Sequence, residues 1–164
     1  MPISKKILGI DPGTAATGFG LIEVHKGQLN IVEAGVIKTK SSLSLDKRLV
    51  IIHRQLDKLI KKHHPQIVSV EQLFFCRNVK TATAVGMARG VILLACAQNK
   101  VKLEEYTPLQ VKQALTGYGQ ASKKQIQLMV KSRLKLKNIP RPDDLSDALA
   151  IAICSSQTNH YFKK

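Results

Sequence analysis

The chain has 164 residues with a hydrophobic share of 44%, which is typical of one globular domain. Its longest uninterrupted apolar run, residues 90–97, is far shorter than the ~20 residues that span a bilayer. No apolar segment of the kind found in secretory signals occurs near the N-terminus. We therefore expect one cytoplasmic domain over residues 1–164, with no membrane contact and with a basic tail at about residues 157–164.

Basic residues outnumber acidic ones, 26 against 11, so the formal net charge is +15. Such an excess favours a polyanionic partner, most commonly nucleic acid. A basic surface that serves solubility alone is one alternative. An anionic membrane surface is a weaker one, because the cations are spread along the whole chain. Three cysteines without a Cys-x-x-Cys pair, and five histidines without a His-Glu-x-x-His pattern, argue against disulfides and zinc. A hydrolase of this composition would have to use carboxylates.

Strand patterns fill the first part of the chain. Alternating and β-branched residues predict strands at residues 6–12, 18–24 and 29–38, the last two joined by a hairpin around Gly27. Apolar residues at helical spacing predict a helix over residues 45–63, which Pro65 ends. Residues 66–71 form a short β-branched strand.

The second part of the chain alternates between helices and one strand. The pattern predicts a long helix over residues 78–99, a strand over 101–106 and a helix that Thr107 and Pro108 open. A basic helix follows from Ser122 to about residue 136, and a last helix runs from Asp143 to about residue 156. Three neighbouring strands followed by alternating units predict an α/β domain with a mixed sheet.

Four carboxylates fall where an open α/β sheet places a ligand site. Asp11 ends the first predicted strand and Glu71 ends the fourth, and ligand sites lie at the carboxyl ends of strands. Asp144 and Asp147 are three residues apart in the first turn of the last helix, hence on one face. We predict that these side chains form one cluster.

Each of these acids also has a purely structural interpretation. Asp11 opens a stretch that matches a type II turn, with Pro12 and Gly13 at its centre. Acids in a first helical turn usually cap the helix or stabilise its dipole. Their joint occurrence favours a site, because clustered carboxylates repel one another unless a cation neutralises them. Hard oxygen ligands suit Mg²⁺ or Mn²⁺, and two such ions stabilise the attacking and leaving oxygens of a phosphodiester.

Five motifs then occur in order: Gly-Ile-Asp-Pro-Gly-Thr at residues 9–14, Val-Glu-Gln-Leu-Phe-Phe at 70–75, Ala-Arg-Gly at 88–90, Gln-Val-Lys-Gln at 110–113 and Asp-Leu-Ser-Asp-Ala-Leu-Ala-Ile-Ala at 144–152. Together they resemble the RuvC family, the Holliday-junction resolvases of bacteria, from about residue 5 to 155. The resemblance implies a ribonuclease-H-like fold with a mixed five-stranded sheet flanked by helices on both faces. It also implies a homodimeric, Mg²⁺-dependent endonuclease that nicks two opposed strands of four-way junction DNA symmetrically, in recombination and repair. A RuvA–RuvB type of branch-migration complex is the partner that the family implies.

The resemblance also assigns roles to single residues. It places the catalytic and metal-binding carboxylates on Asp11, Glu71, Asp144 and Asp147. The Asp-x-x-Asp spacing selects Asp144 over Asp143, which we expect to act only at the helix start.

Aromatic and basic residues supply the expected DNA contacts. Aromatic side chains in a loop beside a nuclease site can stack on unpaired bases. The resemblance assigns this role to Phe74, whereas we expect Phe75 to pack on the core. It places two lysines near the scissile phosphate, and we add two further cations as DNA-binding candidates, the four being Lys112, Lys123, Lys124 and Arg77.

A stripe of small residues marks the long helix. Ala82, Gly86 and Gly90 recur at intervals of four residues. Because glycine inside a helix costs about 1 kcal/mol relative to alanine, close packing must offset the loss. The stripe could approach the domain's own sheet, or it could form the dimer interface that the resemblance favours.

Two other classes of protein remain as alternatives. The first motif also opens the sugar-kinase, actin and chaperone ATPases, but these need two such domains and a second glycine-rich phosphate loop, which a chain of 164 residues lacks. A non-catalytic nucleic-acid-binding module would explain the charge, but it would leave acids such as Asp11 and Glu71 facing DNA, where they would weaken binding. Metal-dependent nicking of junction DNA would distinguish these classes.

Overall fold

The computed structural model describes residues 4–72 and 79–161, with side chains up to residue 158. Its strands are β1 (Lys5–Asp11), β2 (Ala16–His25), β3 (Gln28–Lys38), β4 (Ile67–Glu71) and β5 (Lys102–Tyr106). They form one sheet in the order β3-β2-β1-β4-β5. The first three strands pair antiparallel, and β4 and β5 continue the sheet parallel to β1. The mixed five-stranded sheet is therefore confirmed.

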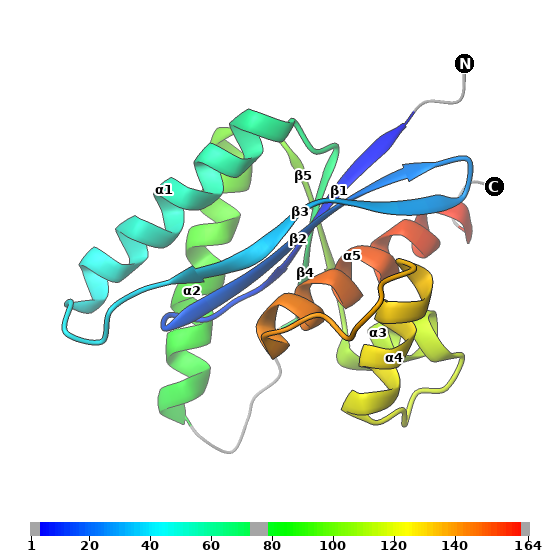
Figure 1. Ribbon diagram of the computed structural model, residues 1–164. Coiled ribbons are helices and arrows are strands. Elements are labelled where there is room, and N and C mark those ends of the chain that lie inside the picture. Colours follow the sequence, from blue (N-terminus) through cyan, green and yellow to red (C-terminus); the bar gives the residue numbers. More distant parts are fainter. Residues whose placement is uncertain (1–3, 73–78, 162–164) are drawn as a thin grey trace.

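The helices lie on both faces of this sheet (Figure 1). They are α1 (Leu45–His63), α2 (Val79–Gln98), α3 (Pro108–Thr116), α4 (Lys123–Arg133) and α5 (Asp143–Tyr161). Leu8 and Ile10 of β1 pack with α1 and α2 in one core, and Ile7 packs with α3, α4 and α5 in the other. Because neighbouring residues of a strand point to opposite faces, the continuous apolar run of β1 serves both cores.

Two helix starts follow their predicted caps. The Thr107 hydroxyl accepts a hydrogen bond from the Gln110 backbone at 3.1 Å, and the Gln110 side chain accepts one from the Thr107 backbone at 2.8 Å. Ser122 and Gln125 form the same reciprocal pair at the start of α4. Each pair satisfies backbone donors that the first turn leaves open, which fixes where α3 and α4 begin.

Two local predictions are wrong. Helix α5 does not stop near residue 156 but continues to Tyr161, so the first part of the expected basic tail is helical. Near its end, Ser156 Oγ donates to the Ile153 carbonyl and Thr158 Oγ1 to the Cys154 carbonyl, so the helix itself satisfies these side chains. The segment after Asp11 is not a type II turn, because Gly13 lacks the positive φ that such a turn requires. Glycine is needed there for space, since a Cβ on Gly13 would lie 2.3 Å from the carbonyl oxygen of Ala16.

Helix α2 is apolar over much of its surface. By length and composition it could cross a membrane, a test that core helices of soluble proteins also pass. The length of the uninterrupted apolar run, used above to test for a membrane span, therefore understates how apolar this helix is as a whole. The face of α2 that packs on the domain carries Ala88, Ile92, Ala95 and Cys96, whereas Met87 and Leu94 are exposed.

Helix α5 lies unusually close to the sheet because glycines form the floor beneath it. Gly9 of β1 pairs with Gly20 of β2, and Gly18 lies opposite Asp11. A Cβ on Gly9 would lie 2.1 Å from the Ala148 carbonyl oxygen, and one on Gly18 would lie 2.0 Å from that of Asp144. These are backbone atoms of α5, so no side-chain rotation could relieve the clash. The glycines therefore fix the height of α5 above β1 and β2.

Replacing Gly9 by alanine should therefore destabilise the protein strongly. We expect Gly9→Ala to lower the unfolding free energy by about 2–4 kcal/mol, the upper range for overpacking, because α5 must move away from β1. Gly35→Ala is the control, because its Cβ would meet only the far end of the Phe19 side chain, at 2.9 Å, and no backbone atom of another element. Urea unfolding of both variants checks this. An equal or larger loss for Gly35→Ala would contradict the proposed floor.

Candidate active site

Strand register places Asp11 and Glu71 side by side. Strands β1 and β4 are parallel and their last paired residues are Ile10 and Val70, so each acid lies one position further on. Ile7 and Ile67 point to the α3–α5 face, and the two-residue period of a strand sends Asp11 and Glu71 to that same face. This arrangement agrees with the prediction that the two strand ends meet.

The first turn of α5 adds the other two acids of the predicted cluster. The backbone of Asp144 rests on Gly18, directly opposite Asp11 in the sheet. Asp147 follows at the spacing that keeps it on the same side of the helix. Asp144 and Asp147 both raise the pKa of Asp11 through their charges. The structure therefore brings Asp11, Glu71, Asp144 and Asp147 to one end of the sheet.

A cavity of about 230 Å³ opens beside this cluster. Its polar lining consists of two acids and two lysines from four elements: Glu71 of β4, Asp147 of α5, Lys112 of α3 and Lys123 of α4. Two of the cations expected near a phosphate thus lie where an anionic substrate would meet the acids. Lys124 is exposed and does not line the cavity. Phe74, Phe75 and Arg77 lie outside the described residues.

The acids raise one another's affinity for protons. Burial, followed by the charges of Asp147, Asp144 and Glu71, raises the pKa of Asp11 from 3.8 to about 7. Burial and Asp147 also raise the pKa of Glu71, against the opposing effect of Lys112. Burial raises the pKa of Asp147 although Lys123 acts in the opposite direction. The two lysines therefore neutralise the cluster only in part.

The donor set suits a hard divalent cation in chemistry, although its side chains do not yet enclose one. All four acids offer carboxylate oxygens, the ligands that Mg²⁺ and Mn²⁺ prefer. Burial and then the charges of the neighbouring acids raise the pKa of Asp11, and a bound cation would oppose both effects. Among the described residues, no three acid, histidine or cysteine side chains lie close enough together to hold a metal ion as they stand. Binding of an ion would require the carboxylates to turn inward.

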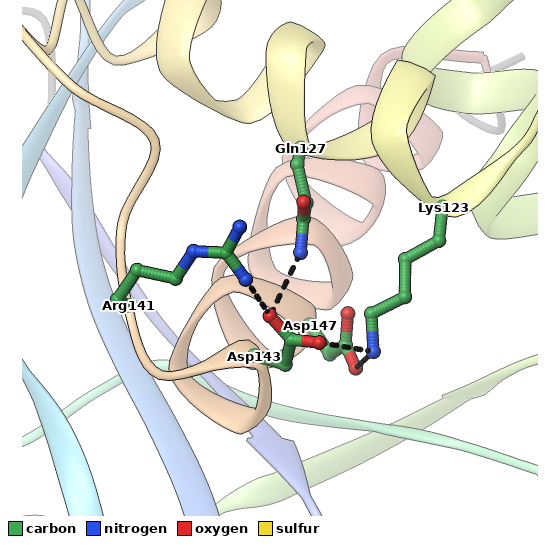
Figure 2. Close-up of polar contacts among 5 residues, drawn as sticks. All are labelled: Lys123, Gln127, Arg141, Asp143 and Asp147. Atoms are coloured by element: carbon green, nitrogen blue, oxygen red, sulfur yellow. Dashed lines mark hydrogen bonds and ion pairs between the residues drawn. The ribbon is translucent and has the colours of Figure 1, made fainter.

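Asp143 has contacts that the sequence did not indicate. Its Oδ2 lies 3.1 Å from Nζ of Lys123, and its Oδ1 accepts a hydrogen bond from Gln127 Nε2 at 3.0 Å (Figure 2). Arg141 also donates to Oδ1. Lys123 in turn lies 3.2 Å from Oδ2 of Asp147, so one ammonium group bridges Asp143 and Asp147. Asp143 therefore has contacts beyond its place at the helix start, which the sequence analysis did not expect. The unfavourable position of Lys123 in the first turn of α4 was the one available sign that it has an anionic partner.

The small-residue stripe of α2 does not pack on the domain's own sheet at Gly90, its last residue. A Cβ on Gly90 would have nothing within 4 Å among the described residues. The same side of the helix exposes Val79, Met87 and Leu94, with Val79 at 76% and Leu94 at 51%. An open glycine among exposed apolar side chains is a surface suited to close contact with another molecule.

Comparison with known proteins identifies the family. The model of the family described as crossover junction endodeoxyribonuclease RuvC matches residues 7–155. A relative of that description from Caldicellulosiruptor saccharolyticus is 52% identical over 150 residues, covering 91% of this chain and 90% of the relative. Another from Desulforamulus reducens is 51% identical, covering 95% and 96%.

Solved structures agree with this result. Thermus thermophilus RuvC in complex with a Holliday junction substrate superposes with a TM-score of 0.90 at 36% identity, covering 94% of each chain. The yeast mitochondrial Holliday junction resolvase Ydc2, at 17% identity and a TM-score of 0.69 over 96% of this chain and 81% of the other, shares the fold. The domain thus has the ribonuclease-H-like architecture of junction-resolving nucleases. The chain belongs to the RuvC family.

The raised pKa of Asp11 leads to a prediction about stability. The folded, metal-free protein keeps a proton on Asp11 up to about pH 7, whereas the unfolded chain loses it near pH 4. The stability that this proton contributes is complete below about pH 4 and is lost as the pH rises through about 7. Asp11→Asn should therefore unfold at higher urea concentration than the wild type at pH 8 in EDTA. The gain should be at most a few kcal/mol, at about 1.4 kcal/mol per pKa unit, and should vanish towards pH 4.

Asp57 provides a control of opposite sign. Hydrogen bonds from Lys61 and Asn99 lower the pKa of Asp57, so Asp57→Asn should lose stability at pH 8. A wild type and an Asp11→Asn variant with equal stability at pH 8 would show that Asp11 is not under electrostatic strain.

Proposed function

We propose that this chain resolves four-way DNA junctions as a metal-dependent endonuclease, by symmetric paired nicks during recombination and repair. The observation that carries the proposal is that acidic and basic side chains line the same cavity. Acids that fit a divalent cation, Glu71 and Asp147, share its wall with the phosphate-binding candidates Lys112 and Lys123. Membership of the RuvC family supports the junction as substrate.

In this proposal Asp11, Glu71, Asp144 and Asp147 hold the metal. Mg²⁺, or Mn²⁺ in its place, would supply activation of the attacking water and charge neutralisation at the leaving oxygen, with two ions per site as the expected number. The chain's own part is to present the carboxylates from rigid elements. Asp11 and Glu71 stand at strand ends, and Asp144 and Asp147 on a helix that the glycine floor holds in place.

The cavity lysines bind and orient the phosphate. Lys112 and Lys123 approach from α3 and α4, opposite the sheet that carries Asp11 and Glu71. Their positive charge attracts the backbone that the acids would otherwise repel. Lys124 and Arg77 extend the basic surface, and Phe74 remains the proposed base-stacking residue on the strength of the family resemblance.

Cleavage mapping on a mobile four-way junction tests the proposal. We expect paired nicks at symmetric positions in two strands of like polarity, in Mg²⁺ but not in EDTA, and little cutting of linear duplex of the same sequence. A non-catalytic binding module would retain the junction without cutting it, which would overturn the proposal.

Neutral variants of the acids should separate cleavage from binding. Each should lower the cleavage rate by several orders of magnitude, because an amide keeps the shape of the side chain but loses the charge that holds the metal. In EDTA the variants should bind the junction at least as tightly as the wild type, because a charge that repels phosphate is gone. Gel-shift and single-turnover assays measure both quantities for Asp11→Asn, Glu71→Gln, Asp144→Asn and Asp147→Asn. Near-normal cleavage by any one of them would remove that residue from the site.

The exposed face of α2 supports a homodimer in this proposal. Gly90 and its apolar neighbours Met87 and Leu94 offer a surface on which a second helix can approach closely. Ala82 and Gly86 continue the stripe towards the start of the helix. Two copies would supply the two sites that paired nicks require. A RuvA–RuvB type of complex, supplying junctions in the cytoplasm, is the further partner we propose.

Gly90→Leu should disrupt this dimer without unfolding the monomer. The added side chain enters open space in this chain, and replacing glycine in a helix interior stabilises it by up to about 1 kcal/mol. We expect sedimentation to show monomers and junction cleavage to lose its pairing. Ser132→Leu, which adds the same side chain at an exposed position of α4, should leave the dimer intact. A Gly90→Leu variant that remains dimeric would place the interface elsewhere.

A further inference from the structure

Asp143 stands beside the acidic cluster, one residue before Asp144 and linked to Asp147 through the Lys123 ammonium. Its carboxylate instead faces α4 and the segment before α5, where Lys123, Gln127 and Arg141 meet it (Figure 2). Its described direct contacts are therefore with these three side chains and not with the proposed metal-binding acids.

The two oxygens of Asp143 have different partners. Oδ1 accepts hydrogen bonds from Gln127 and Arg141, and Oδ2 faces the Lys123 ammonium at 3.1 Å. Gln127 is buried and lies one helical turn after Lys123 on α4. An exposed ion pair of two free side chains is weak because both must be ordered. Here the carboxylate is already oriented by its other oxygen, so less ordering remains when the lysine binds.

Lys123 needs such an anchor. Its side chain is long and flexible, and it extends from α4 across to the first turn of α5. Its other partner, Asp147, lies 3.2 Å away and is a proposed metal ligand. When the Asp147 carboxylate binds the metal, it is no longer free to pair with the Lys123 ammonium. Asp143 is then the remaining described partner that keeps the ammonium at the cavity.

We propose that Asp143 is a positioning residue whose carboxylate, aligned by Gln127 and Arg141, holds Lys123 at the cavity to contact the substrate phosphate. This inference rests on the proposed nuclease function. It assigns Asp143 an effect on cleavage that acts through Lys123. A residue that only began α5, or only fastened the preceding segment through Arg141, would act independently of Lys123.

A double-mutant cycle distinguishes these roles. Asp143→Asn keeps the size of the side chain and its oxygen acceptor, and asparagine is as good as aspartate at helix starts. We expect it to slow single-turnover cleavage of bound junction in Mg²⁺ roughly 10- to 100-fold, the scale of a misplaced catalytic contact, with unchanged or tighter junction binding in EDTA. In a Lys123→Gln background the same substitution should cost less than about 2-fold. Equal losses in both backgrounds would overturn the proposal.

Two further variants act as matched controls. Asp143→Glu keeps the charge and should recover most of the cleavage rate if the ion pair with Lys123 is what matters. Arg141→Gln removes a partner of Asp143 that has no described contact with Lys123, so it should slow cleavage less than Asp143→Asn does. If Arg141→Gln equals Asp143→Asn, including in the Lys123→Gln background, Asp143 only fastens the segment before α5 and the proposal fails.

A measurement without cleavage separates this inference from the proposed function. In metal-free protein, ¹⁵N relaxation reports how ordered the Lys123 ammonium is, with exposed Lys124 as the internal reference. We expect Asp143→Asn to lower the order of Lys123 towards that of Lys124. Unchanged order would overturn the positioning role even in an active nuclease. Lost order in a protein whose wild type does not cut junctions would overturn the nuclease function instead.

Discussion

The arrangement of this domain depends on how closely α5 approaches the sheet. Gly9, Gly18 and Gly20 leave β1 and β2 without side chains beneath the helix. The backbone of α5 occupies the space that a Cβ on Gly9 or Gly18 would need, and the Leu149 side chain occupies that of Gly20. This contact joins the two most distant parts of the chain. It also determines where the first turn of α5 lies, because the backbone of Asp144 rests on Gly18, the residue that pairs with Asp11. The acidic cluster is thus a consequence of backbone packing, which is stiffer than side-chain packing.

Much of this arrangement follows from local sequence rules. Strand ends at Asp11 and Glu71, the caps at Thr107 and Ser122, and the order of elements all depend on neighbours in the chain. The end of α5 could not be predicted from local rules alone, because Ser155 near that end donates a hydrogen bond to Glu104 of β5. This is a tertiary contact, which periodicity cannot reveal.

In the candidate site, too, some features could be predicted from the sequence and others could not. The acids could be found because each stands at the end of a strand or the start of a helix. The ion pair between Asp143 and Lys123 could not be found from the sequence, because it joins two helices and depends on how α4 packs against α5. The exposure of Gly90 likewise needs the fold, since spacing alone shows a stripe of small residues without showing which side of α2 meets the domain. Local patterns thus locate charged groups but not their partners.

In the proposed function, the acidic cluster, the cavity lysines, the metal ion and the DNA phosphate all lie in one small space, so their charges must balance there. Asp11 already resists ionisation in the metal-free protein, and a phosphate would add further negative charge. DNA and divalent cations should therefore assist each other's binding, since any effect of one on the affinity of the other is reciprocal. Lys123 is one of two cations that the chain itself supplies at the cavity, and it contacts Asp147, which is also a proposed ligand of the metal. A second carboxylate at Asp143 resolves this competition, because the lysine can stay beside the cavity while Asp147 turns to the ion.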